Sequence, residues 1–290
     1  MSEWTIGILG GSGLYEMEAL EEAQWIEMAT PWGPPSDALL IGRLHGVRFV
    51  FLPRHGRGHR IPPSQVNARA NIDALKRAGC TDIVAVSAVG SLREALEPGR
   101  FVLADQFIDR TFAREKSFFG PGLVAHVSMA DPVCPRLSER MAAAAKAAGA
   151  EVARGGTYLA MEGPQFSSRA ESELYRSWGC DLIGMTAMPE AKLAREAELP
   201  YALVGMVTDY DCWRRGEEAV EVSAIVARLM ANAATARRMI EAFAEALPEK
   251  RPASPIDTNL DSAIITAPAA RDPSLVAKLD AVAGRVLGRP

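Results

Sequence analysis

The chain contains little cysteine, and its cysteines show no pairing in sequence. The four stand at positions 80, 134, 180 and 212, tens of residues apart and without any C-x-x-C spacing. This spacing fits neither a zinc ribbon nor a disulfide-dense secreted domain. A strand-like run begins within a few residues of the start, which leaves no room for a signal-type segment, so a reducing, cytoplasmic setting is expected.

Long apolar runs and an excess of positive charge are also missing. No run of about 18 apolar residues occurs, so no membrane-spanning helix is expected. The 32 Lys and Arg residues are outnumbered by 36 Asp and Glu residues, which gives a net charge of −4. We therefore expect no broad surface for nucleic acid or for an anionic membrane, and any bound anion must be held by local donors.

Short apolar runs alternate along the chain with stretches that carry apolar residues at helical spacing. This alternation predicts an α/β fold, a single domain with a central mixed, mostly parallel sheet flanked by helices. Residues 1–247 form this domain, and residues 248–290 form a C-terminal extension with a short helix near 274–286, which packs on the same domain or on a neighbouring subunit. Strands are expected at 6–9, 47–52, 83–89, 101–103, 182–184 and 201–207, and helices at 64–78, 135–148, 168–178, 189–197 and 217–246.

The first candidate motif is the glycine-rich segment 10–14, which follows the first expected strand and includes Ser12. Glycines let backbone N–H groups approach an anion, and a serine hydroxyl adds one more donor. A dinucleotide-binding fingerprint would require glycine where Glu16 stands, and the Gly-Lys pair of a P-loop is missing. A tight turn and a phosphate contact both remain open.

The second motif, residues 53–60, places three arginines and two histidines at the end of an apolar strand. His55 and His59 have the spacing of a metal-binding pair, but Gly56 and Gly58 disfavour the required helix and no Glu or Cys accompanies them, so no metal is expected. The guanidinium fork of an arginine beside an imidazole instead suits a tetrahedral oxyanion. A solvated basic loop is the alternative.

The third motif places Ser87 near the carboxyl end of another expected strand, where ligands bind in open α/β sheets. Its hydroxyl and the neighbouring backbone N–H groups would complete an anion site. An ordinary strand-to-helix turn is an equally good interpretation.

The fourth motif, residues 208–213, follows the last expected strand and carries Asp209 and Asp211 beside Trp213. Two carboxylates at i and i+2 face one side of an extended segment. Such a pair suits base recognition or acid–base work, because a carboxylate accepts hydrogen bonds and a protonated carboxyl also donates. Repulsion between the two raises one pKa. A helix cap or a surface turn is the alternative.

These motifs stand in the order seen in the trimeric purine nucleoside phosphorylase superfamily, which the chain resembles over roughly residues 5–247. The most specific segments are 10–15, 54–57, 161–171, 185–190 and 208–213. The resemblance implies a nucleoside phosphorylase-like fold and a salvage transferase that uses inorganic phosphate as co-substrate and no other cofactor. The phosphate-binding positions that it implies are Ser12, Arg54, His55, Ser87, Ala88 through its backbone, and Thr186.

The resemblance also implies the positions that bind the nucleoside. Met185 underlies the ribose, Phe166 packs against the purine, Ser167 lies at the base edge, and Asp209 with Asp211 recognises adenine. The positions implied for the pocket of the 5'-substituent are His59, Val222 and Ile225. His126 resembles a residue supplied by a neighbouring subunit, which implies a homotrimer with shared sites.

Two positions favour an adenine nucleoside. Relatives that prefer 6-oxopurines carry Glu where this chain has Ser167 and Asn where it has Asp209. A 6-oxo group against a carboxylate would set acceptor against acceptor, at a cost of about 1–3 kcal/mol. The apolar Val222 and Ile225 favour a methylthio group over a hydroxyl by about 1–2 kcal/mol. Phosphorolysis of 5'-methylthioadenosine is therefore expected.

Three alternatives to this activity remain. They are a phosphorylase for 6-oxopurine nucleosides or 5'-methylthioinosine, a hydrolytic nucleosidase, and a non-catalytic nucleoside-binding protein. One departure from the resemblance is that Ser12 and Ser87 stand where many relatives have threonine.

Overall fold

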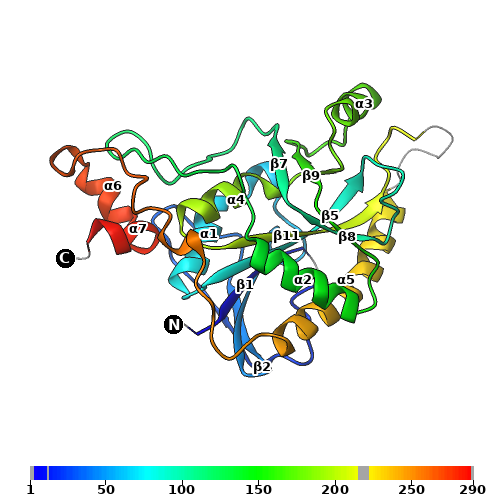
Figure 1. Ribbon diagram of the computed structural model, residues 1–290, viewed down its shortest axis with the longest axis horizontal. Helices are drawn as coiled ribbons and strands as arrows, with labels where there is room; N and C mark the ends of the chain where they lie inside the picture. The colour runs from blue at the N-terminus through cyan, green and yellow to red at the C-terminus, as the bar shows by residue number, and fades with distance from the viewer. Residues whose placement is uncertain (1–2, 12, 215–221, 289–290) are drawn as a thin grey trace.

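The computed structural model describes residues 3–11, 13–214 and 222–288. These residues form one α/β unit around an 11-stranded sheet (Figure 1), which confirms the expected fold class. Six of the ten strand pairings are parallel and four are antiparallel. The strands are β1 Thr5–Gly10, β2 Glu21–Ile26, β3 Leu39–Leu44, β4 Val47–Pro53, β5 Asp82–Ser91, β6 Phe101–Ala104, β7 Gln106–Asp109, β8 Val152–Arg154, β9 Thr157–Ala160, β10 Leu182–Gly184 and β11 Tyr201–Asp209.

Parallel strands occupy the middle of the sheet. Strand β1 lies between β4 and β5, and β5 pairs in turn with β11, all in parallel. All four are almost entirely buried. Because they are parallel, their carboxyl ends meet at one edge of the sheet, and this edge carries the candidate site.

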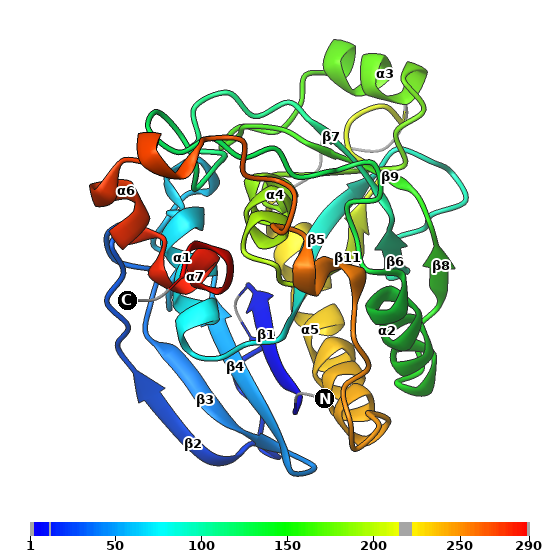
Figure 2. The same ribbon diagram turned by 60° about the vertical axis from the view of Figure 1, so that its left-hand side comes forward.

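The helices cover both faces of the sheet (Figure 2). One hydrophobic cluster joins the sheet to α1, α4 and α7, and a second cluster joins its other face to α2 and α5. Helix α3 stands apart from both layers, beyond the carboxyl edge. The helices are α1 Ala68–Arg77, α2 Pro135–Ala147, α3 Arg169–Ser177, α4 Ala187–Glu196, α5 Val222–Glu245, α6 Pro273–Lys278 and α7 Asp280–Leu287. No helix in the described ranges is long and apolar enough to cross a membrane.

The six expected strands and the expected helices are present, most with shifted ends, and residues 217–221 of the helix expected at 217–246 lie outside the described residues. The helix expected from residue 64 begins at Ala68, because the side chain of Asn67 caps it by accepting from the N–H of Ala70 at 3.1 Å. The helix expected at 274–286 is divided at Leu279 into α6 and α7.

The C-terminal extension packs against the rest of its own chain. Leu279, Val282 and Ala283 are buried in the cluster that contains α1 and α4. Helix α7 lies beside α1, where Asp280 accepts from Arg77 at 3.0 Å.

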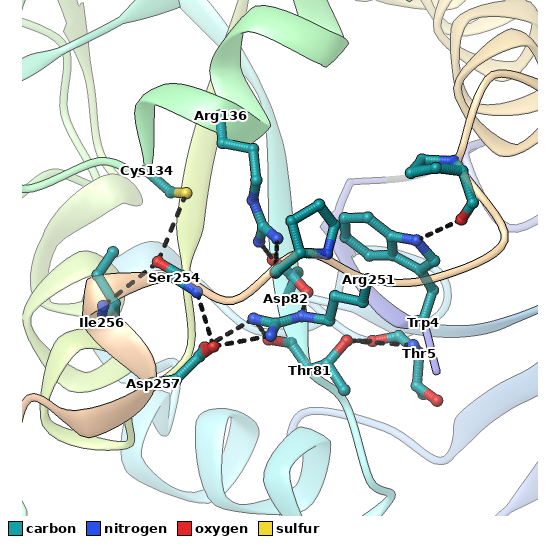
Figure 3. A network of polar contacts seen from close by, with 12 residues as sticks. Trp4, Thr5, Thr81, Asp82, Cys134, Arg136, Arg251, Ser254, Ile256 and Asp257 are labelled. Atoms are coloured by element: carbon teal, nitrogen blue, oxygen red, sulfur yellow. Dashed lines mark hydrogen bonds and ion pairs between the residues drawn. The ribbon is translucent and has the colours of Figure 1, made fainter. Parts of the chain in front are cut away.

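A second contact of the extension lies at the amino-terminal edge of the sheet (Figure 3). Asp82, the first residue of β5, is fully buried. Arg136 of α2 and Arg251 of the extension both point toward its carboxylate, and Arg251 Nε lies 2.5 Å from Asp82 Oδ2. Arg251 also donates to Asp257 at 2.7 Å. These ion pairs connect β5, α2 and the extension far from the carboxyl edge.

Candidate functional site

Arg54 connects three strand ends at the carboxyl edge of the sheet. It directly follows β4, and its backbone N–H donates to the carbonyl of Gly10 at 2.9 Å. Its guanidinium donates to the carbonyls of Leu9 and Val86, each at 3.1 Å. The side chain is only 2 % exposed. Arg54 therefore fixes the ends of β1, β4 and β5 relative to one another.

The sequence context suggested that the fork of Arg54 faces an open anion site. The structure shows a different arrangement. Arg54 Nε and Nη2 instead bind the two carboxylate oxygens of Glu190 in α4, and both side chains are buried. Burial acts to lower the pKa of Arg54, but the adjacent Glu190 carboxylate outweighs it and raises that pKa. The expected bidentate contact with an oxyanion is thus replaced by a buried ion pair.

Two hydroxyls meet beside this ion pair. Ser87 Oγ of β5 lies 3.0 Å from Oγ1 of Thr186, the residue that precedes α4. Ala88 follows Ser87 in the strand. Arg54, Ser87, Ala88 and Thr186 are called the cradle below. They come from two strand ends and one helix start, so the cradle depends on the tertiary fold.

His55 follows Arg54 and is mostly buried. Its Nδ1 lies 2.9 Å from the carbonyl oxygen of Ile61, which can only accept, so Nδ1 carries a proton. Burial and the Arg54 charge lower the pKa of His55 to about 4, so the ring is neutral at pH 7 and Nε2 is a hydrogen-bond acceptor. The ring of His59 stacks on it with centroids 4.3 Å apart. Among the described residues, no three His, Cys, Asp or Glu side chains form a group that would hold a metal ion.

Asp209 and Asp211 lie over Gly90 of β5, the strand that also carries Ser87. Asp209 pairs with Gly90, just after an irregularity in the register of β11. A Cβ atom at Gly90 would meet Asp209 Oδ1 at 3.1 Å and Asp211 Cβ at 3.5 Å, so a larger residue would crowd the carboxylates. Ser87 and Gly90 are three residues apart on one strand, so their Cα atoms are roughly 10 Å apart.

The surroundings of Asp209 favour its protonated form. Its Oδ1 accepts from the backbone N–H of Asp211 at 2.7 Å, and its Oδ2 lies 2.6 Å from Thr208 Oγ1. The same hydroxyl lies 3.2 Å from the carbonyl of Val89. Thr208 has one hydroxyl proton to donate to these two acceptors, so it compensates the Asp209 carboxylate only in part. Burial also raises the pKa of Asp209.

Asp211 has a strained backbone and a buried, unsatisfied oxygen. Its φ is 53°, in the left-handed region. Within the part of the chain that the structure describes, its Oδ2 has no hydrogen-bond partner. Burial, and less strongly the Asp209 charge, raises the pKa of Asp211 against the lowering effect of the nearby Ser172 hydroxyl. An unpaired buried oxygen costs about 1–3 kcal/mol, which a ligand N–H would recover.

The other positions implied for the base and ribose lie on the loops before α3 and α4. The carbonyl of Ser167 accepts from Cys212 Sγ at 3.2 Å, which joins the loop before α3 to the segment after β11. Phe166 is 57 % exposed. Met185 lies against Gly163, where a Cβ atom would come within 2.5 Å of its Sδ.

Of four further implied positions, three lie outside the described residues and one lies elsewhere. Ser12 lies outside the described residues, as do the side chains of Val222 and Ile225 on the first turns of α5. His126 is exposed, and its backbone N–H donates to Ala263 of the C-terminal extension at 2.9 Å. The structure therefore places His126 against the extension and not among the strand ends that carry the cradle.

A second buried ion pair, which was not predicted from the sequence, joins Arg114 Nε to Glu162 Oε1 at 3.0 Å. Arg114 also donates to the carbonyls of Met185 at 2.6 Å, Met188 at 2.8 Å and Glu162 at 2.6 Å. The Glu162 carboxylate accepts from the N–H of Phe112 at 2.7 Å. This network holds the segments before and after Thr186. Glu162 stands inside a segment that carried the resemblance, whereas no pattern marked Arg114.

Similarity to known proteins shows the family of this chain. The family model described as the phosphorylase superfamily matches residues 5–245. The chain belongs to this superfamily. Among curated relatives in the superfamily, the S-methyl-5'-thioadenosine phosphorylase of Cereibacter sphaeroides is 61% identical over 97% of this chain and 98% of its own, and that of Rhodospirillum rubrum is 58% identical over 98% and 97%.

Solved phosphorylase structures share the fold closely. A methylthioadenosine phosphorylase from an antarctic soil metagenomic library superposes with a TM-score of 0.92 at 46% identity, covering 97% of this chain and 99% of its own. An adenosine/methylthioadenosine phosphorylase variant from Schistosoma mansoni, in complex with methylthioadenosine, has a TM-score of 0.79 at 37% identity, covering 84% of this chain and 91% of its own.

Proposed function

We propose that this chain is an S-methyl-5'-thioadenosine phosphorylase. It transfers 5-methylthioribose from adenine to inorganic phosphate and releases adenine and 5-methylthioribose 1-phosphate. The observation that carries the proposal is the placement of the Asp209 and Asp211 carboxylates over the strand that also carries Ser87 of the cradle. The identity of at least 58% to two curated enzymes of this name supports the same substrate.

Phosphate attacks C1' of the ribose while the C–N bond breaks through an oxocarbenium-like state, so no covalent enzyme intermediate forms. The phosphate oxygens accept hydrogen bonds from Ser12, Ser87, Thr186 and the backbone N–H of Ala88. They also accept from the one N–H of Arg54 that the described protein acceptors do not engage. Neutral His55 accepts from a protonated phosphate oxygen through Nε2. Holding phosphate beneath the sugar makes the attack effectively unimolecular.

The purine leaves with negative charge, which the enzyme neutralises. Protonated Asp209 donates to N7, and Asp211 accepts from the exocyclic amine through its otherwise unpaired oxygen. Ser167 contacts the base edge, Phe166 packs against the purine, and Met185 underlies the ribose. A 6-oxopurine would leave the Asp211 acceptor without a donor, at a cost of about 1–3 kcal/mol, which favours adenine.

The remaining parts of the proposal concern the 5'-group and the assembly. His59, Val222 and Ile225 form the pocket of the methylthio group. His126 reaches the site of a neighbouring subunit in a cytoplasmic homotrimer, which is consistent with its position away from the cradle of its own chain. Phosphate is the co-substrate, and no other cofactor takes part.

The test is adenine release from 5'-methylthioadenosine with and without inorganic phosphate, with 5'-methylthioinosine as the comparison substrate. Phosphate-dependent adenine release that is much faster than hypoxanthine release is expected. Release without phosphate would identify a hydrolase, faster release of hypoxanthine would identify a 6-oxopurine enzyme, and saturable binding without release would identify a binding protein.

A further inference from the structure

Glu190 is a buried carboxylate at the cradle to which the proposed reaction gives no role. It is 1 % exposed, and its oxygens accept from Arg54 and, at 3.4 Å, from the hydroxyl of Tyr201. Glu190 lies four residues after Thr186 at the start of α4, and both line a small cavity together with Arg54. The carboxylate is therefore in direct contact with Arg54, one of the groups that would hold phosphate.

Glu190 reduces the number of Arg54 N–H groups that can bind phosphate. A guanidinium has five N–H groups. Four are engaged, two by the Glu190 carboxylate and one each by the carbonyls of Leu9 and Val86. The one that is left is on Nη1, whose other N–H donates to Val86, the residue directly before Ser87. Phosphate thus receives at most one hydrogen bond from Arg54.

The charges of these groups balance. Arg54 is compensated by Glu190, and Arg114, the other cation that lines the cavity, is compensated by Glu162. His55 is held neutral by burial, which lowers its pKa. The described cationic side chains at the cradle therefore give it no net positive charge, which is unusual for a site that binds a multivalent anion.

We propose that Glu190 is a positioning residue that sets the anion affinity of the cradle by occupying the fork of Arg54 and compensating its charge. This inference rests on the proposed function, since it assigns the cradle to phosphate. Phosphate is then bound mainly by neutral donors, which leaves its oxygens reactive and lets the sugar phosphate depart. Tight binding of phosphate in the ground state would lower KM without raising kcat.

The test is Glu190→Gln, which removes the charge and keeps the shape. The Gln oxygen still accepts from Nε, and the carbonyls of Leu9 and Val86 still hold the guanidinium. An uncompensated charge within contact range of the anion, in a medium of intermediate dielectric, is expected to lower KM for phosphate and the inhibition constant of sulfate by roughly tenfold. We expect kcat to fall and KM for the nucleoside to stay the same.

Glu196→Gln is the matched control, because it removes another buried carboxylate from the same helix. Glu196 accepts from Ser117 and Phe118 and has no contact with Arg54. Its variant is expected to keep the wild-type KM for phosphate. Glu190→Asp, which keeps the charge one methylene further from the fork, is expected to lie between wild type and Glu190→Gln, and it carries the test if Glu190→Gln does not fold.

The rise in melting temperature caused by sulfate, measured without nucleoside, reads the anion affinity directly. A larger rise for Glu190→Gln than for wild type supports the proposal. An equal or smaller rise, or a KM for phosphate that is unchanged or increased, overturns it. If wild type releases no adenine with phosphate, the proposed function fails, while the sulfate measurement still decides the part played by Glu190.

Discussion

Glu196 provides a quantitative prediction about pH and stability. Its side chain is buried near the end of α4, where it accepts from Ser117 Oγ and from the N–H of Phe118, each at 2.7 Å. Burial raises its pKa from 4.5 to about 7, and these two hydrogen bonds only partly oppose that rise. The folded protein therefore keeps a proton on Glu196 that the unfolded chain has lost.

This difference makes folding stability depend on pH with a definite sign. The stabilisation from the protonated carboxyl is complete below pH 4.5 and is lost as the pH rises through about 7. The gap between the two pKa values corresponds to about 3 kcal/mol at about 1.4 kcal/mol per pH unit. In Glu196→Gln the amide carbonyl still accepts from Phe118 and the amide nitrogen donates to Ser117, so the variant resembles the protonated state at every pH.

The assay is urea unfolding of wild type and Glu196→Gln between pH 5 and pH 8. The variant is expected to gain up to about 3 kcal/mol over wild type across this range, or about 5 °C in melting temperature for a chain of this size. Glu139→Gln is the control, because the Glu139 side chain is 74% exposed. A stability difference between wild type and Glu196→Gln that stays constant from pH 5 to pH 8 would refute the reasoning.

Three further changes test the candidate site. Asp209→Asn is expected to lower kcat on 5'-methylthioadenosine by about 100-fold or more, because the amide cannot transfer a proton to N7; parallel kcat/KM measurements on 5'-methylthioinosine must show a smaller loss, and an equal loss contradicts the assignment. Thr208→Val removes a hydroxyl whose hydrogen bond lowers the pKa of Asp209. The high-pH limb of the kcat profile is therefore expected to move to higher pH. A limb that stays in place or moves to lower pH argues against Asp209 as the proton donor. Arg114→Met leaves the Glu162 carboxylate buried without its cation and is expected to cost about 3–5 kcal/mol in urea unfolding, whereas a cost below about 1 kcal/mol would show that the pair does not hold these loops.

The central strands and the loops that follow them were predictable from the sequence because both depend on local pattern. Mostly apolar runs such as 83–89 predict buried parallel strands, and ligands bind where such strands end. The edge strand β2 carried no such signal, since all of its residues are exposed in the fold. Its pairing with β3 comes from the neighbouring strand and not from its own composition.

The electrostatics of the site were less accessible from the sequence. Arg54 stood out as a phosphate ligand, but its fork is taken by Glu190, which lies 136 residues away in the chain. Arg114 binds carbonyls that lie 47 to 74 residues further along. A residue's charge and position in a motif indicate that it binds an anion, whereas the partner that neutralises it is determined by which helix packs over which strand end.

The contact between Arg251 and Asp82 has a consequence for folding of the chain during synthesis. Asp82 begins the central strand β5, yet Arg251 is added to the chain 169 residues later. Until then Arg136 is the cation among the described residues that compensates the Asp82 carboxylate, and a buried charge that lacks part of its pairing is costly. Although domains generally begin to fold from the N-terminal side as they are made, the ion pairs at the amino-terminal edge of this sheet are complete only after Arg251 has emerged from the ribosome. A ribosome stalled before codon 251 would hold a chain in which β5 stays accessible to proteases and chaperones.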